Sequence, residues 1–184
     1  MSARTKRVQL AAGIVGVLTV ATLTLSTSPA SASGTYSGRA YIYGAGNWVG
    51  DWDDEGILST STNASSNATC LWQKILWADL ATETNGTPFD AADIDGHFGA
   101  NTKAATKDWQ ARYHLEADGS VGKDTWAEAG TNLEDHYDPG DTAVDTYRGI
   151  WDNLALTRDS DGRYHFEDGD GNARIAGYDY LTCT

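Results

Sequence analysis

The chain has few basic residues, few histidines and only one long apolar run. It contains 13 Lys and Arg against 26 Asp and Glu, an excess that predicts repulsion from nucleic acid and from anionic membranes. Its four histidines have neither the His-x-His nor the His-Glu-x-x-His spacing of zinc sites. The sequence also lacks a Gly-x-Ser-x-Gly nucleophile motif and a phosphate-binding loop. We therefore expect no metal, no cofactor and no recognisable catalytic set. A carboxylate pair for glycan hydrolysis stays open, because so many acidic residues always offer pairs.

The one long apolar run lies at the N-terminus. Arg4, Lys6 and Arg7 precede apolar residues 10–25, and Ala30-Ser31-Ala32 offers a small-residue cleavage site. This pattern predicts a secretory signal peptide at residues 1–32. The alternative is a membrane anchor, but the run is shorter than the roughly 20 residues that a spanning helix needs. Cleavage would leave ten basic and 26 acidic residues, a net charge of −16, and no further segment apolar enough to enter a membrane.

Both cysteines lie in the part that would be exported. Cys70 and Cys183 are 113 residues apart, and an even number of cysteines in an oxidising compartment favours a disulfide. The chain-entropy model gives the closure of such a loop roughly 4–5 kcal/mol. A catalytic thiol is the alternative. We disfavour it, because Cys183 is next to last in the chain and Cys70 is expected inside a helix packed by aromatic residues.

One short phrase occurs twice with an offset of 23 residues. Its two copies are Asp95-Gly96-His97-Phe98-Gly99, followed by Thr102, and Asp118-Gly119-Ser120-Val121-Gly122, followed by Thr125. An Asp-Gly pair predicts a tight turn, because the carboxylate accepts nearby backbone N–H groups and glycine tolerates positive φ. The apolar residue after each turn is expected to tuck under it, and a helix is expected to follow.

Three helices are predicted around these two turns. Residues 67–81 carry apolar side chains at helical spacing, namely Trp72, Ile75, Leu76 and Leu80. After the first turn, Ala105, Trp109 and Tyr113 recur every four residues along one side of a second helix. A shorter helix at residues 123–129 presents Trp126. The predicted fold class is therefore mainly α, with a small three-helix bundle at residues 67–131.

The same residues carry a family resemblance. The motifs are Leu71-Trp72-Gln73-Lys74-Ile75-Leu76-Trp77-Ala78-Asp79, the first turn, Trp109-Gln110-Ala111-Arg112-Tyr113, the second turn and Thr125-Trp126. In order and spacing they resemble the peptidoglycan-binding domain of secreted bacterial cell-wall proteins, especially the versions from filamentous actinobacteria. The resemblance covers about residues 67–131. The chain departs from the family pattern at Thr69 and Trp72, where aliphatic residues are usual, and at Leu80, where a glycine often ends the first helix.

The resemblance implies a ligand groove near the first turn. Sugars stack their apolar face on aromatic rings and need polar partners for their hydroxyl and acetamido groups. The candidate ligand-binding residues are Gln73, Asp95, Phe98, Thr102, Trp109, Gln110 and Trp126. Trp109 and Trp126 are equally plausible as core residues. Gln110→Ala is expected to weaken binding without changing the melting temperature.

The two extensions differ in character. Residues 33–66 combine an aromatic and glycine-containing segment with a Ser/Thr-rich linker, and the acidic run at residues 51–55 is interpreted as solvated surface. Residues 132–184 predict a three-stranded meander with strands at 153–157, 163–167 and 173–181. Asp168, Asp170 and Asn172 resemble the start of a calcium loop, but Ala173 stands where that loop needs glycine, so a turn is favoured.

These observations favour a secreted, non-catalytic protein of the cell wall that binds peptidoglycan, through either its glycan or its stem peptide. We expect it to be a monomer. One alternative is a small wall hydrolase with catalytic residues in the extensions. Another is a protein-interaction module that uses exposed aromatic residues, for which Trp48, Trp52 and Trp151 are the candidates.

Overall fold

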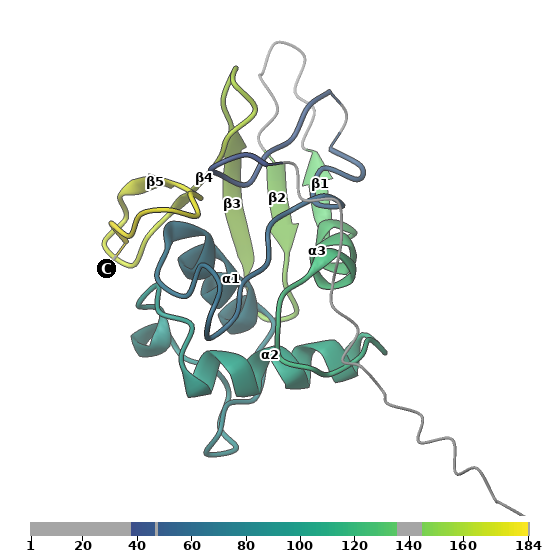
Figure 1. Cartoon of the computed structure of the whole chain (residues 1–184), viewed down its shortest axis with the longest axis vertical. Helices are drawn as coiled ribbons and strands as arrows, with labels where there is room; N and C mark the ends of the chain where they lie inside the picture. Colours follow the sequence, from purple (N-terminus) through teal and green to yellow (C-terminus); the bar gives the residue numbers. More distant parts are fainter. Residues whose placement is uncertain (1–37, 47, 136–144, 184) are drawn as a thin grey trace, which may run out of the picture.

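The computed structural model describes residues 38–46, 48–135 and 145–183 (Figure 1). The predicted signal peptide and the Pro139-Gly140 turn lie outside these ranges. The helices are α1 (Asn67–Ala78), α2 (Ala100–Arg112) and α3 (Lys123–Gly130), with a 3-10 turn η1 (Ala91–Asp93) before α2. The strands are β1 (Leu133–Asp135), β2 (Asp145–Arg148), β3 (Asn153–Arg158), β4 (Tyr164–Glu167) and β5 (Ala173–Ile175).

The strands form one antiparallel sheet in the order β1-β2-β3-β4-β5. Tyr147 of β2 pairs with Leu133 on one side and with Leu154 on the other, which fixes the register of three strands. Because side chains alternate along a strand, Leu154 and Leu156 are buried while their neighbours on β3 are exposed. The sheet therefore contributes one face to the core.

The predicted mainly α fold, a three-helix bundle with a three-stranded meander, is wrong. The described residues form three short helices and a five-stranded antiparallel sheet. The sequence does not reveal β1 and β2, because strands of three and four residues are too short to show an alternating pattern. Nor is the sheet an appendage. Figure 1 shows α1 between the sheet and α2, and α1 contacts β3, β5 and α2.

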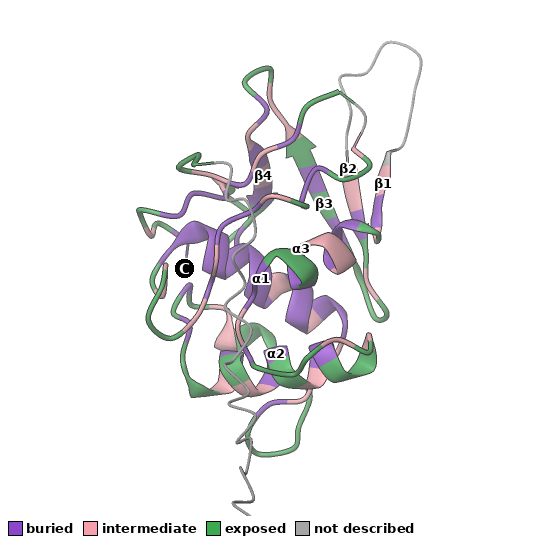
Figure 2. Cartoon of the chain, turned by 45° about the vertical axis from the view of Figure 1, so that its right-hand side comes forward, coloured by how far each residue is buried: buried purple, intermediate pink, exposed green. Residues whose placement is uncertain are grey.

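Among the helices, α1 is the most deeply buried. Ten of its twelve residues are buried, and Figure 2 shows it enclosed in the middle of the molecule. The Ser66 hydroxyl caps its N-terminus by accepting a hydrogen bond from the Thr69 N–H at 3.0 Å. A helix with so little exposed surface depends on packing rather than on intrinsic propensity.

Two helices end at residues in the left-handed conformation, a position that usually holds glycine. After α1, Leu80 has φ 50°, its N–H bonds to the Trp77 carbonyl and the Ala81 N–H bonds to the Leu76 carbonyl. After α2, His114 has φ 60° and repeats the pattern. Leu80 thus adopts the backbone conformation of the glycine that it replaces in the family pattern, and α1 ends three residues before the predicted bound of 81.

Four tryptophans with no exposed surface form the centre of the core: Trp52, Trp72, Trp109 and Trp126. Their indole rings meet edge to face, with centroids 5.2 Å apart for Trp72 and Trp109 and 5.4 Å apart for both Trp52 and Trp72 against Trp126. Such contacts add about 0.5–1.5 kcal/mol each beyond area burial. The N-terminal extension and the helices therefore share one core.

The aromatic residues that were candidates for an exposed interaction surface do not share one environment. Trp52 is fully buried, so its assignment to an exposed surface is wrong. Trp48 is half-buried, whereas Trp151 is 68% exposed. The sequence could not separate them, because all three stand in short segments without a clear periodicity.

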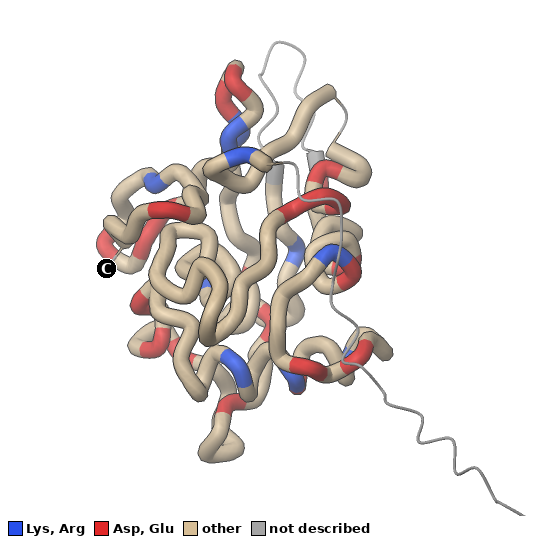
Figure 3. The backbone as a smooth tube through the Cα atoms, in the orientation of Figure 1, with Lys and Arg blue, Asp and Glu red and all other residues tan. Residues whose placement is uncertain are grey.

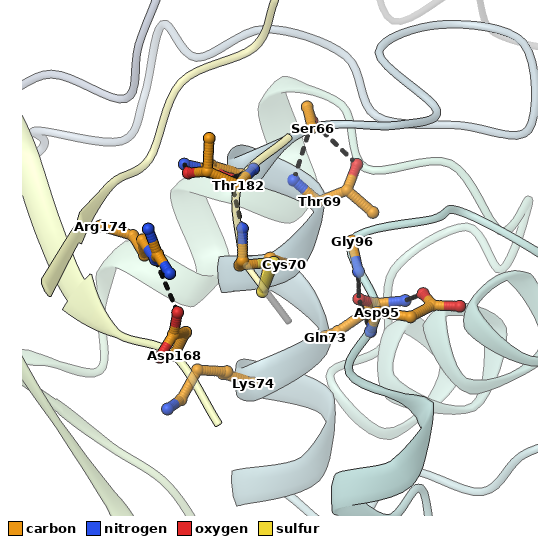
Figure 4. Close-up of a disulfide and its surroundings, with 12 residues drawn as sticks. Ser66, Thr69, Cys70, Gln73, Lys74, Asp95, Gly96, Asp168, Arg174 and Thr182 are labelled. Atoms are coloured by element: carbon orange, nitrogen blue, oxygen red, sulfur yellow. Dashed lines mark hydrogen bonds and ion pairs between the residues drawn. A yellow bond between two sulfur atoms is a disulfide. The ribbon is translucent and has the colours of Figure 1, made fainter. Parts of the chain in front are cut away.

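The predicted disulfide is confirmed. Cys70 of α1 is bonded to Cys183, and their Cα atoms lie 6.6 Å apart (Figure 4). The same end of the chain is held by Asn67, whose side-chain oxygen accepts hydrogen bonds from the Thr182 and Cys183 N–H groups. The C-terminal segment is thereby fixed against the N-terminal turn of α1.

The N-terminal segment pairs with the C-terminal half of the sheet through Ile42. The Ile42 N–H donates to the Ala176 carbonyl, and the Ile42 carbonyl accepts from the Tyr164 N–H. Glu55 closes this junction: its carboxylate accepts the Tyr43 N–H at 2.7 Å and the Tyr178 hydroxyl at 2.6 Å. Asp51 and Glu55 are both buried, so the interpretation of residues 51–55 as solvated surface is wrong for these two.

Glu55 makes the stability of the protein depend on pH. Burial raises its pKa from 4.5 to about 7, against the opposing hydrogen bonds from Tyr178 and Tyr43. A carboxyl with a raised folded-state pKa favours folding while it is protonated in both states, and this contribution is lost as the pH rises from about 4.5 through 7. Glu55→Gln should remove this component of the pH dependence, worth up to about 3 kcal/mol, in urea unfolding between pH 5 and 8. Asp53→Asn, an exposed neighbour, should follow the wild-type profile. Parallel profiles for Glu55→Gln and wild type would contradict this account.

Candidate functional site

A buried glutamine holds each Asp-Gly turn. Gln73 of α1 donates through Nε2 to Asp95 Oδ1 at 2.8 Å, to the His97 carbonyl at 3.0 Å and to Thr102 Oγ1 at 3.1 Å. Its Oε1 accepts the Asp95 N–H at 3.1 Å and the Gly96 N–H at 2.7 Å. Figure 4 shows the Gln73 side chain pointing from α1 into this turn. One amide therefore satisfies both the donors and the acceptors that the turn directs inward.

Gln110 of α2 repeats the arrangement at the second turn. It donates to Asp118 Oδ1 at 3.1 Å, to the Ser120 carbonyl at 2.8 Å and to Thr125 Oγ1 at 3.1 Å. Its Oε1 accepts the Gly119 N–H at 2.9 Å. The doubled phrase is thus half of a longer repeat, in which the preceding helix supplies a Trp-Gln pair. The sequence signal of this longer repeat is the pair Trp72-Gln73 and its counterpart Trp109-Gln110.

The glycines of both turns are required by conformation and by space. Gly96 has φ +72° and Gly119 has φ +78°, in the region that side chains with a Cβ rarely adopt. A Cβ on Gly96 would lie 2.2 Å from Leu181 Cδ1, and one on Gly119 would lie 3.0 Å from the Lys103 carbonyl oxygen. The predicted tight turns are confirmed, with Asp95 and Asp118 accepting the N–H two residues on.

Both turns also pair with the N-terminal extension, and the first turn pairs with its predicted linker. The Phe98 N–H donates to the Ala64 carbonyl, whereas Val121 exchanges two backbone hydrogen bonds with Leu58. Phe98 and Val121 are buried, as the sequence predicts for the residues that tuck under the turns. The N-terminal extension therefore braces both copies of the repeat.

Six of the seven predicted ligand-binding residues lie inside the protein. Gln73, Phe98, Thr102, Trp109, Gln110 and Trp126 are each at most 3% exposed. Internal partners occupy the two indole N–H groups: Trp109 donates to Asp79 Oδ2 at 2.6 Å and Trp126 to the Gly56 carbonyl at 2.8 Å. Asp95 is the exposed member. Ligand contact by the six stays a prediction, and the burial of Gln110 reverses the expectation that Gln110→Ala leaves the melting temperature unchanged.

The two turns differ in what lies beside them. The first turn borders a surface hollow of about 660 Å³, lined by Ala91, Ala92, Ile94, Asp95, His97, Leu181, Thr182 and Cys183. The side chains of Lys103 and Lys107 of α2 lie against Gly119 of the second turn. The C-terminal segment, fixed by the disulfide, thus builds a hollow at one turn of an otherwise repeated structure.

The hollow combines a carboxylate, an imidazole and apolar walls. The exposed Asp95 carboxylate can accept hydrogen bonds from a hydroxyl, an amide or an amine. His97 Nδ1 lies 2.8 Å from Ser65 Oγ, which orients its ring at the rim. Ile94 and Leu181 supply apolar surface that is half-buried. Such a set of groups suits a polar ligand with apolar patches, as sugars and peptides are.

A second hollow, of about 290 Å³, lies between residues 43–46 and residues 158–162. Burial acts to raise the pKa of Asp159 here. Hydrogen bonds from His165, from the Arg163 N–H and side chain and from the Asp161 N–H outweigh burial and hold that pKa well below its usual range. Beneath it, Asp51 accepts the Tyr164 hydroxyl and forms an ion pair with Arg158. These groups already have partners within the fold, so they fix the β3–β4 hairpin rather than offer a reactive centre.

In the turn at residues 168–172, the Asp168 carboxylate also has its hydrogen-bond partners within the protein. The Asp168 carboxylate accepts the Asp170 and Asn172 N–H groups and pairs with Arg174 at 2.6 Å. This is the turn that the sequence favoured over a calcium loop. Among the described residues, no group of three or more His, Cys, Asp or Glu is placed to hold a metal ion. Within the same ranges, no helix is long and apolar enough to cross a membrane.

Comparison with known proteins identifies one region. Residues 83–128 match the family described as "Putative peptidoglycan binding domain". The match begins after α1, includes both Asp-Gly turns, and ends in α3, about a quarter of the chain. This match supports a peptidoglycan-binding type of domain in the chain, in agreement with the predicted resemblance. No curated protein and no solved structure matches the chain.

The two glutamines, Gln73 and Gln110, should contribute about equally to the stability of the fold. Gln73→Ala or Gln110→Ala would leave the buried N–H of a turn glycine without a partner, at a cost of about 1–3 kcal/mol for each such group. We expect each substitution to lower the free energy of urea unfolding by about 2–3 kcal/mol. Lys123→Ala, exposed at the start of α3, is the control and should change it by less than about 0.5 kcal/mol. A neutral Gln110→Ala would show that the second network does not stabilise the fold.

Proposed function

We propose that this protein is a secreted, non-catalytic binder of bacterial cell-wall peptidoglycan, and that the hollow beside the first Asp-Gly turn receives the polymer. The observation that carries the proposal is the family match over both turns, together with the hollow beside the first of them. The predicted signal peptide and the disulfide between Cys70 and Cys183 support a location outside the cytoplasm. Glycan and stem peptide both remain open as the part recognised.

The charge of the protein bears on how it would bind. Acidic residues are spread along the described chain (Figure 3), and the mature chain would carry a net charge of −16. Anionic wall polymers would be repelled at long range. Binding must therefore rest on short-range contacts, such as hydrogen bonds to Asp95 and apolar contact with Ile94 and Leu181.

The non-catalytic part of the proposal has support from the carboxyl groups of the extensions. Glu55, whose pKa of about 7 would suit a general acid, is only 3% exposed and lines neither hollow. Asp159 borders the smaller hollow, but Arg163 and His165 engage it. The hydrolase alternative would need an accessible acid beside an accessible base or nucleophile.

Asp95→Asn tests the site with a matched control. Asparagine at this position can still accept from Gln73 and from the His97 N–H, so the turn is kept and only the charge is removed. We expect binding to purified sacculi, measured by co-sedimentation, to weaken about tenfold, the loss of roughly 1.4 kcal/mol. Asp118→Asn makes the same change at the second turn and should bind as wild type. Equal binding by both variants would remove the first turn from the site.

A peptidoglycan zymogram tests the absence of catalysis. The purified mature protein should leave the substrate layer intact and release neither reducing ends nor free amines from sacculi. A lysozyme lane serves as the positive control. A cleared band from pure protein would establish the hydrolase alternative and direct attention to the acidic residues of the extensions.

A further inference from the structure

The tip of the β2–β3 hairpin carries the only adjacent pair of large exposed hydrophobic residues in the described parts of the chain. Ile150 is 61% exposed and Trp151 is 68% exposed. Both lie outside residues 83–128, so the family match does not cover them. Exposed indole is uncommon on protein surfaces, and neither side chain contributes to the core.

The backbone beneath this pair is fixed to the C-terminal end of α1. The Trp151 N–H donates to the Ala78 carbonyl at 2.8 Å, and the Ile150 N–H donates to Asp79 Oδ1 at 3.0 Å. Gly149 permits this approach, since a Cβ there would lie 2.7 Å from the Ala78 carbonyl oxygen. The hairpin tip thereby satisfies backbone and side-chain acceptors that the helix end would otherwise leave open.

Asp79 makes this anchor rigid. Its carboxylate is fully buried and also accepts the Trp109 indole N–H and the Tyr147 hydroxyl, both at 2.6 Å. Burial, reinforced by the Asp79 charge, raises the pKa of Tyr147 well above its ordinary value, so this hydroxyl stays a donor. The anchoring contacts use the backbone N–H groups of Ile150 and Trp151, so side chains other than proline could occupy those positions without loss of the anchor.

We propose that the Ile150–Trp151 tip is a second binding surface, on which the indole stacks against a sugar ring of a neutral glycan strand. The identity of that strand as the glycan of peptidoglycan rests on the proposed function. A planar ring held on a fixed backbone loses little freedom on binding, which is what stacking on the C–H face of a sugar requires. Asp152 and Asn153, exposed beside it, can bond sugar hydroxyl or acetamido groups.

Size and charge favour a sugar over a protein partner. A stable protein interface buries about 800 Å² on each partner, whereas the other large exposed hydrophobics, Val49 and Tyr180, come from separate segments. The acidic surface and Asp152 disfavour anionic polymers. One aromatic ring flanked by a carboxylate and an amide matches the dimensions of one or two sugar units.

The tip and the hollow lie at opposite ends of α1. The first turn contacts Ser66 at the N-cap, whereas the hairpin tip contacts Ala78. Twelve residues at 1.5 Å each separate these ends by about 18 Å. The two surfaces can therefore be removed independently, and a polymer that engages both would gain avidity over either alone.

The test uses the mature protein and two neutral probes, a tetramer and a hexamer of β-1,4-linked N-acetylglucosamine. Binding is followed by isothermal titration and by the protection of tryptophan emission from acrylamide. We expect Trp151→Ala to weaken binding of both probes at least tenfold and Trp151→Phe to weaken it less. Val49→Ala, a change at an equally exposed apolar residue, should have no effect. All three should keep the wild-type melting temperature.

Each other outcome has a definite meaning. Wild-type affinity in Trp151→Ala would overturn the proposal, and so would the failure of wild-type protein to bind either probe, which would leave a protein partner as the occupant. Sacculus binding that is lost in Asp95→Asn but unchanged in Trp151→Ala would overturn the second surface and support the proposed function. Probe binding that depends on Trp151, without any binding to sacculi, would support stacking and overturn the proposed function.

Discussion

The fold depends on a buried amide that must satisfy each Asp-Gly turn from within. The turn directs the N–H of its glycine and a backbone carbonyl inward, and the buried N–H needs a partner within the protein. Gln73 and Gln110 each present a donor and an acceptor at the right place. Because both glutamines project from helices, each turn fixes the position of the helix before it and, through Thr102 or Thr125, of the helix after it.

The two networks are alike, but they lead to different surfaces. At the second turn α2 itself covers the glycine, through Lys103 and Lys107. At the first turn the neighbour is the C-terminal segment, which Cys70 and Asn67 hold in place. A repeated scaffold becomes a single site when a non-repeated segment packs against one copy. Under the proposed function, the disulfide would shape the binding surface as well as stabilise the fold.

Much of the helical part could be predicted from the sequence, because its signals are local. The Asp-Gly turns, the buried Phe98 and Val121, and the starts of α1 and α3 at Asn67 and Lys123 follow from short motifs and helical spacing. The five-stranded sheet could not be predicted, since β1 is defined by its pairing with β2, and β2 by its pairing with β1 and β3. Burial of Asp51 and Glu55 depends on Tyr164 and Tyr178, more than 100 residues away, which no local pattern reports.

The candidate site also could not be predicted in full from local motifs. Motif matching selected Gln73, Trp109 and Gln110 because they belong to the family pattern, yet the structure gives them internal partners. A residue that a fold always needs and a residue that a ligand needs look the same in a motif. Only the solvent exposure of each side chain distinguishes the two kinds of residue. By that criterion Asp95 is available to a ligand within the matched region, and Trp151 is available outside it.

Asp79 explains how these two surfaces belong to one rigid unit. A buried carboxylate is costly unless several donors compensate for its lost hydration. Here the donors come from three elements: Trp109 from α2, Tyr147 from β2 and Ile150 from the hairpin tip. Arg112 adds a hydrogen bond to the Asp79 carbonyl. If any one donor were lost, water could not replace it at the buried Asp79 carboxylate. The helices, the sheet and the hairpin are therefore held in fixed positions relative to one another. A ligand that contacts both the hollow and the tip would therefore meet two surfaces at a spacing that α1 fixes. The protein would lose little conformational entropy when both surfaces bind.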